Sequence, residues 1–419
     1  MCSVLTERTP KTRPAKAPSA GANAGGPVGL GMSTPGRLAA LSLLVLAGGL
    51  PAQTPYFPPR GEWARATPRA LELDQARLDS ARVLAIRSEA SAPRDQAEAQ
   101  RRSFGAREPH AEIIGPMAER GDPSGIVIYR GRVIAEWGPT DRVDMTHSVT
   151  KTFLSTVVGV AVRDGRIDGV RDTVRRYMPP GVDLFEAEHN RTITWDDLLR
   201  QTSDWQGTLW GKPDWADRPE GPRDGWQDRP LHEPGTRYKY NDVRVNLLAL
   251  ATLHVLGEPL PEVLRREIME PIGASSIWHW EGYENSWVDI QGARVQSVSG
   301  GGHWGGGMFI NAWDMARLGY LYLHDGRWGA RQLLPESWVA MARTPGPVNP
   351  DYGFMNFFLN TDRRLLPSAP ESAVVFIGNG MNAVVVDWDH DVVVVVRWIR
   401  DGRALDAVVA QVLAALPDG

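Results

Sequence analysis

Residues 146–164 read THSVTKTFLSTVVGVAVRD, a polar start followed by an apolar continuation. Apolar side chains recur at helical spacing over residues 153–161, which predicts a buried helix. Ser148 and Lys151 are three positions apart, so on a helix they share one face with Cβ atoms about 5–6 Å apart. The segment therefore places a hydroxyl and an amine side by side at the start of a buried helix.

The chemistry of this pair depends on the protonation state of the amine. A serine hydroxyl is a poor nucleophile until a neighbouring base takes its proton. A lysine is such a base only when neutral, and burial lowers a lysine pKa because the charged form loses its hydration. Free N–H groups at a helix start also favour developing negative charge. We therefore predict Ser148 as a nucleophile and Lys151 as its proton acceptor. The alternative is a helix-capping serine beside a solvated lysine.

A second candidate group precedes another apolar helix, predicted over residues 243–256. Residues 234–242 read PGTRYKYND and end in the sequence Tyr240-Asn-Asp242. A tyrosine beside a cation can act as a general base or a proton relay. The polar side chain that follows, Asp242, can hold the lysine or a substrate amide. The alternative interpretation of Tyr240 is a buried tyrosine in a turn.

The third candidate element is a glycine-rich turn near the C-terminus. Residues 376–382 read FIGNGMN and adjoin predicted strands, where glycines let a substrate backbone approach closely. The backbone N–H of Met381, paired with that of Ser148, is a candidate oxyanion hole. The alternative is an ordinary hairpin turn. The turn supplies three candidate substrate-binding positions: Gly378, Asn379 and Gly380.

The two ends of the chain carry the strand signals. Residues 125–137 hold two β-rich runs around a short turn, and three further runs follow at 373–377, 382–387 and 392–398. We predict an α+β fold in which both chain ends form one antiparallel sheet flanked by helices. A mostly helical region, about residues 171–333, is inserted between them.

The N-terminus has the pattern of an export signal. Arg37 precedes the apolar stretch Leu38–Leu50, which is too short to span a bilayer because a spanning helix needs about 20 residues. The alternatives are an N-terminal anchor or a disordered leader. We expect export to the periplasm or the extracellular space, without stable membrane insertion. The predicted organisation is a non-native leader (1–31), a signal peptide (32–53), a linker (54–69) and one domain (70–417).

Composition excludes several classes of protein. The 419 residues are 42% hydrophobic, with a formal net charge of −4 and a single cysteine, Cys2. No basic stripe follows the leader, so we expect no nucleic-acid partner. No zinc-ligand spacing occurs, and we expect neither a metal nor another cofactor. The alternative is a metal site assembled from distant Asp, Glu and His side chains. Sixteen tryptophans leave a carbohydrate-binding module as a remote alternative.

The order of these motifs resembles the serine β-lactamase and penicillin-binding protein superfamily, in its class C-like branch. The resemblance covers residues 121–419. It implies that Ser148 is acylated, that Lys151 accepts its proton, and that Tyr240 assists in deacylation. It implies a β-lactamase/transpeptidase-like fold. The residues that carry it are SVTKTF (148–153), DGRID (164–168), ITWDDLLRQTS (193–203), PGTRYKY (234–240), GGGM (305–308), DMAR (314–317) and the Gly378–Gly380 turn.

Two positions depart from the superfamily pattern. The second motif usually ends in asparagine, where this chain has Asp242, and an acid there tends to keep Lys151 protonated. The third motif usually starts with lysine or histidine, where this chain has Gly378. β-Lactam recognition uses a cation at that position for the substrate carboxylate. We therefore predict a hydrolase of small-molecule or peptide-like esters or amides, resembling the 6-aminohexanoate-oligomer hydrolases. β-Lactamase or DD-peptidase activity, or an inactive ligand-binding relative, are the alternatives.

Overall fold

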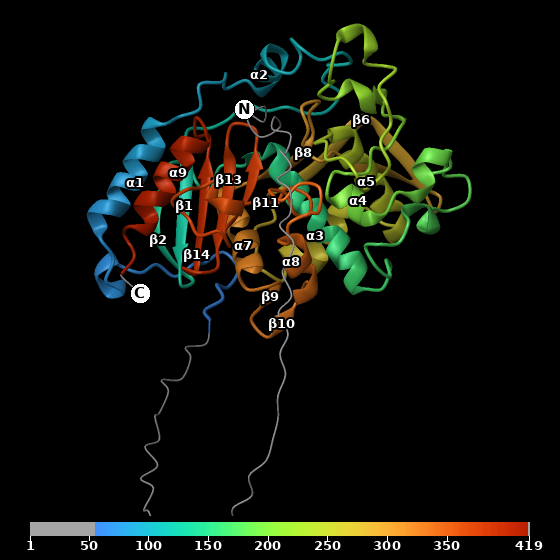
Figure 1. Cartoon of the computed structure of the whole chain (residues 1–419). Coiled ribbons are helices and arrows are strands. Elements are labelled where there is room, and N and C mark those ends of the chain that lie inside the picture. The colour runs from blue at the N-terminus through green and yellow to red at the C-terminus, as the bar shows by residue number, and fades with distance from the viewer. Residues whose placement is uncertain (1–54, 418–419) are drawn as a thin grey trace, which may run out of the picture. The chain divides into compact units, whose positions relative to one another are not determined.

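The computed structural model describes residues 55–417 (Figure 1). The predicted leader and signal peptide, residues 1–53, lie outside the described residues. Within residues 55–417, no single helix is both long and apolar enough to cross a membrane.

The main sheet confirms that the two ends of the chain form one antiparallel sheet. Strand β1 pairs with β14, with Ile126 opposite Val395, and this pairing joins the N-terminal hairpin to the C-terminal strands. The order is β11-β12-β13-β14-β1-β2. Its strands are β1 (Ser124–Tyr129), β2 (Arg132–Trp137), β11 (Phe358–Leu359), β12 (Val374–Gly378), β13 (Asn382–Asp387) and β14 (Val392–Arg397).

Both faces of this sheet are buried. Alternate side chains of a strand point to opposite faces, so Val393 and Val395 join one hydrophobic core, whereas Val392, Val394 and Val396 join the other. Helices α1 (Gln75–Arg87) and α9 (Gly402–Leu413) pack together over the second core (Figure 1). Helix α7 (Ala312–Leu323) covers the first. Burial on both sides explains the unbroken valine run of β14.

A second sheet, which the sequence pattern did not predict, joins three strands of the inserted region to β3, which precedes it. Its order is β3-β8-β6-β7. The long strand β6 contains charged and aromatic side chains without a clean apolar alternation, so it lacks the usual strand signal. This sheet comprises β3 (Asp144–Met145), β6 (His279–Ile290), β7 (Ala293–Val298) and β8 (Gly307–Ile310).

The segment that we predicted as a linker packs on the domain from residue 55 onward. The Tyr320 hydroxyl donates to the Tyr56 carbonyl at 2.7 Å, and the Trp63 indole donates to the Gly131 carbonyl at 3.0 Å. Phe57 and Trp63 contact the first core. Burial of these aromatic side chains holds the segment in place, so residues 55–69 form part of the domain.

The remaining elements complete the helical layers around the site. Helices α1 and α2 are separated by a segment that contains Pro93. Further helices are α2 (Gln96–Arg102), α3 (Thr150–Arg163), α4 (Trp195–Leu199), α5 (Asp242–Leu256), α6 (Leu260–Leu264) and α8 (Glu336–Ala342). Short paired strands are β4 (Thr208–Leu209) with β5 (Lys212–Pro213), and β9 (Arg327–Trp328) with β10 (Arg331–Gln332).

Candidate active site

Ser148 lies in a tight turn at the start of a buried helix, α3. The 3₁₀ turn His147–Val149 leads directly into α3, whose residues from Thr150 to Ala161 are all buried. His147 has a φ of +49°, a conformation that costs energy for a non-glycine residue and persists only where its surroundings impose it. The sharp turn presents Ser148 ahead of the helix.

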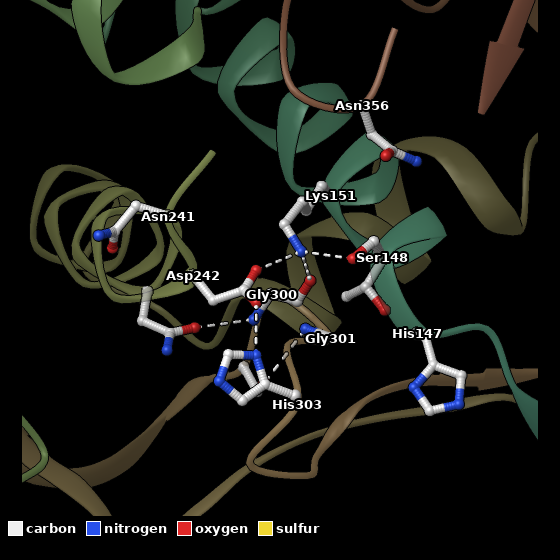
Figure 2. A network of polar contacts seen from close by, with 12 residues as sticks. His147, Ser148, Lys151, Asn241, Asp242, Gly300, Gly301, His303 and Asn356 are labelled. Atoms are coloured by element: carbon white, nitrogen blue, oxygen red, sulfur yellow. Dashed lines mark hydrogen bonds and ion pairs between the residues drawn. The ribbon is translucent and has the colours of Figure 1, made fainter. Parts of the chain in front are cut away.

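The structure brings Ser148 and Lys151 into contact (Figure 2). Lys151 Nζ lies 2.8 Å from Ser148 Oγ and 3.2 Å from the carbonyl oxygen of Gly300. Its third close partner is Asp242, with Oδ1 at 2.7 Å. The Lys151 side chain is fully buried, so these three oxygens replace the water that an ammonium would otherwise hold.

Asp242 is buried at the first position of α5 and shares its charge among three cations. Its Oδ2 atom lies 3.0 Å from Arg218 Nη1 and 3.2 Å from His303 Nδ1. Burial raises the pKa of the carboxyl, but Lys151 and Arg218 outweigh burial and hold the pKa of Asp242 well below its usual range. Asp242 is therefore a carboxylate next to Lys151, and this contact favours the charged form of the lysine.

The neighbouring asparagine does not take the place of Asp242. Asn241 caps α5, where its Oδ1 accepts from the Arg244 backbone N–H at 3.1 Å and its Nδ2 donates to the Asp214 carbonyl at 2.8 Å. Figure 2 shows its side chain on the far side of Asp242 from Lys151. The departure from the superfamily motif is therefore a real change of charge beside the lysine.

Tyr240 lies beside the same lysine. Its ring centroid is 5.1 Å from Lys151 Nζ and 4.9 Å from Arg218 Cζ, which are cation–π distances. Tyr240 is 5% exposed and packs with Tyr352 and Phe358 in a small aromatic cluster. Two cations thus flank the tyrosine that the sequence assigns to proton transfer.

The C-terminal glycine turn meets the Ser148 turn through the end of β12. A Cβ atom on Gly378 would lie 2.0 Å from the Thr146 carbonyl oxygen and 3.2 Å from the Ser148 nitrogen. Asn379 is exposed in the turn that follows, and its carbonyl accepts from the Asn382 side chain at 2.8 Å. Gly380 and Met381 have φ values of +71° and +48°, and the Met381 side chain belongs to the second core. Gly378 is thus the member of the turn that packs directly against the backbone of Thr146 and Ser148.

Gly378→Ala is expected to slow acylation of Ser148 at least about tenfold, because misplacement of a reacting group by an ångström costs up to about 100-fold. The added Cβ would collide with backbone at Thr146 and displace the turn. The measurement is the rate of covalent labelling by a fluorophosphonate. Gly169→Ala is the matched control, since a Cβ there meets no atom within 4 Å. Equal labelling rates in both variants would contradict this close packing.

Sequence reasoning missed the groups behind Asp242. His303 Nε2 lies 2.8 Å from Glu108 Oε2 and 3.9 Å from Asp217 Oδ1. No local spacing links these positions, although His303 stands out within the glycine-rich run SGGGHWGGGM (299–308). We refer to the whole set as the Asp242 cluster, which consists of Glu108, Asp217, Arg218, Asp242 and His303.

Part of the Asp242 cluster resembles a metal site in composition only. Glu108, Asp217 and His303 are the one trio in residues 55–417 whose ligand atoms converge within 4.8 Å. However, Arg218 Nη1 already lies 2.5 Å from Asp217 Oδ1 and supplies the positive charge there. We therefore describe the cluster as an ion-pair network and assign no metal to it.

A helix-flanked antiparallel sheet, with Ser148 and Lys151 at the start of a buried helix, is the arrangement of the β-lactamase/transpeptidase-like fold class. Comparison with family models names that class more closely. The chain belongs to the beta-lactamase family, whose model matches residues 117–416. The superfamily resemblance drawn from the motifs is thereby confirmed.

Solved structures share this fold at low sequence identity. A protein described as a 6-aminohexanoate-dimer hydrolase from Bacillus anthracis is 15% identical, with a TM-score of 0.52, over 86% of this chain and 91% of its own. EstCE1, a hydrolase with promiscuous acyltransferase activity, is 15% identical, with a TM-score of 0.53, over 82% and 99%. A penicillin-binding protein homologue from Caulobacter crescentus is 16% identical, with a TM-score of 0.52, over 78% and 99%. At this identity the likeness establishes the fold.

Proposed function

We propose that this protein is a serine hydrolase that cleaves an ester or amide bond through an acyl-enzyme on Ser148. The observation that carries the proposal is the 2.8 Å contact between Lys151 Nζ and Ser148 Oγ at the start of α3. A proton acceptor within hydrogen-bond reach is what a serine needs to become a nucleophile. Membership of the beta-lactamase family supports a hydrolase.

The reaction follows from the placement of these groups. Ser148 Oγ attacks the substrate carbonyl carbon while its proton passes to Lys151 Nζ. The backbone N–H of Ser148, with that of Met381 as the proposed second donor, stabilises the oxyanion. The carbonyl re-forms as the C–O or C–N bond breaks, and the departing alcohol or amine takes the proton. Water then attacks the acyl group, with Tyr240 beside the lysine as the assisting group, and releases the acid.

The substrate class follows from charge around the nucleophile. Gly378 supplies no cation where β-lactam recognition uses one, so we favour a neutral ester or amide over a β-lactam. The ion pair between Lys151 and Asp242 favours one second candidate, an inactive ligand-binding relative, because a permanently protonated lysine accepts no proton.

Intact-mass analysis after treatment with a fluorophosphonate distinguishes the two candidates. A serine hydrolase gains one covalent adduct, located on Ser148, and turns over short p-nitrophenyl esters. An unmodified protein that turns over no ester or amide would refute the hydrolase proposal and leave the ligand-binding candidate. Preferential turnover of a chromogenic β-lactam would instead overturn the substrate class.

A further inference from the structure

Three members of the Asp242 cluster join Lys151 in one continuous chain of polar contacts that ends at Ser148. Starting from Glu108, the contacts run through His303 (2.8 Å), Asp242 (3.2 Å) and Lys151 (2.7 Å) to Ser148 (2.8 Å). Figure 2 shows the imidazole and the amine on opposite sides of the Asp242 carboxylate. The side chains of His303, Asp242 and Lys151 are at most 2% exposed, so little solvent screens their interaction.

With all three carboxylates ionised, the formal charges of this chain and its neighbours balance when the imidazole is charged. Burial raises the pKa of Asp217, and the charge of Arg218 opposes that rise. Three carboxylates, those of Glu108, Asp217 and Asp242, face two cations. The cations are the guanidinium of Arg218 and the ammonium of Lys151, which is paired with Asp242. A neutral His303 would leave one negative charge in excess, and the lysine would hold its proton more tightly as a result. A charged His303 completes the balance at the Oδ2 atom of Asp242.

We propose that His303 is a positioning residue that, as a cation, neutralises Asp242 and thereby releases Lys151 to accept the proton of Ser148. This proposal rests on the proposed serine-hydrolase function. It explains how an aspartate can occupy a position next to the catalytic lysine that the superfamily gives to a neutral asparagine.

The surroundings of His303 support its charged form. Burial lowers the pKa of His303, but the hydrogen bond to Asp242 and the ion-pair contact with Glu108 outweigh burial. The charge of Asp217 acts in the same direction and that of Arg218 opposes it, and the pKa of His303 rises to about 9. Aromatic rings also cover the imidazole: the Phe104 ring centroid lies 4.5 Å from it in a stacked arrangement, and the Trp304 ring centroid lies at 4.4 Å.

The charged groups around the lysine give the sign of the expected effect. Asp242 is the anion in contact with Lys151, and it also binds Arg218. His147, on the turn before α3, has its pKa lowered to about 4 by burial and by Lys151, so it is neutral near pH 7. Removing the His303 cation therefore leaves Asp242 more fully available to Lys151. Deprotonation of the lysine then requires a higher pH.

The test is the pH profile of kcat/KM for a short p-nitrophenyl ester in the full chain. His303→Gln should raise the pKa of Lys151 and so move the acid limb, the fall of kcat/KM at low pH, to higher pH by about one unit. A charge within about 4–6 Å shifts a pKa by 1–3 units, and the charge of His303 acts on Lys151 through Asp242. Asp242→Asn should move the limb to lower pH. Adding His303→Gln to Asp242→Asn should move it no further, because the anion through which His303 acts is gone.

Several outcomes separate this proposal from the function on which it rests. A wild-type protein that forms no fluorophosphonate adduct refutes the serine-hydrolase function itself. An adduct on Ser148 together with an unmoved acid limb in His303→Gln overturns only the role of His303, since a structural role would lower the rate without shifting the limb. If His303→Gln does not fold, Glu108→Gln should shift the limb in the same direction by less, and no shift would refute the role. A wild-type limb that moves on adding a chelator would assign the cluster to a metal and also overturn it.

Discussion

Ser148→Ala is expected to lower kcat/KM for an ester substrate by about 10⁴-fold or more, because loss of the nucleophile removes the covalent route entirely. The substitution removes the hydroxyl that contacts Lys151 Nζ at 2.8 Å and adds no bulk. The free energy of unfolding should therefore change little. Steady-state kinetics and a urea denaturation curve measure the two quantities.

Ser155→Ala is the matched control for this experiment. Ser155 lies on the same helix, is fully buried, and its Oγ has no hydrogen-bond partner among the described residues. Removing its hydroxyl should leave both turnover and adduct formation intact. Normal turnover by a folded Ser148→Ala protein would contradict the acyl-enzyme mechanism, whereas equal losses in both variants would point to a general disturbance of α3.

Local spacing explains which parts of the fold and site could be predicted. Valine-rich runs such as 392–396 predict a strand because every residue is apolar and turns bound the run. Ser148 and Lys151 could be paired because three positions on one helix fix their proximity, whatever the rest of the chain does. Strand β6 was missed because its polar and aromatic residues form neither an apolar run nor a regular apolar–polar alternation.

The rest of the site depends on tertiary contacts that no spacing encodes. Arg218, His303 and Glu108 come from three loops far apart in sequence, and they meet only because α5 places Asp242 between them. The sequence raised the concern that Asp242 would keep Lys151 charged, and the structure places the two side chains in contact at 2.7 Å. It could not show that two further cations share the same carboxylate. Electrostatic balance of this kind becomes visible only once the groups are assembled.

Lys151→Met is expected to abolish turnover and to destabilise the fold at the same time. Loss of a general base costs about 10²–10⁴-fold in rate, and no other amine contacts Ser148 among the described residues. The same change takes a cation from a carboxylate that is 1% exposed. Breaking a buried ion pair costs about 3–5 kcal/mol, and we expect the lower end because Arg218 and His303 still contact Asp242. Steady-state kinetics and denaturant titration measure the two losses.

The double variant Lys151→Met with Asp242→Asn separates the two roles of the lysine. It removes one positive and one negative charge together, so the buried cluster stays balanced and most of the lost stability should return. Turnover should stay absent, because the proton acceptor is still missing. Asp242→Asn alone retains the amine and should retain turnover. If the double variant recovered activity along with stability, Lys151 would serve only charge balance. Tyr240, whose ring centroid lies 5.1 Å from Lys151 Nζ, would then be the base instead. If Lys151 supports both the fold and the reaction, the double variant should recover stability but not activity.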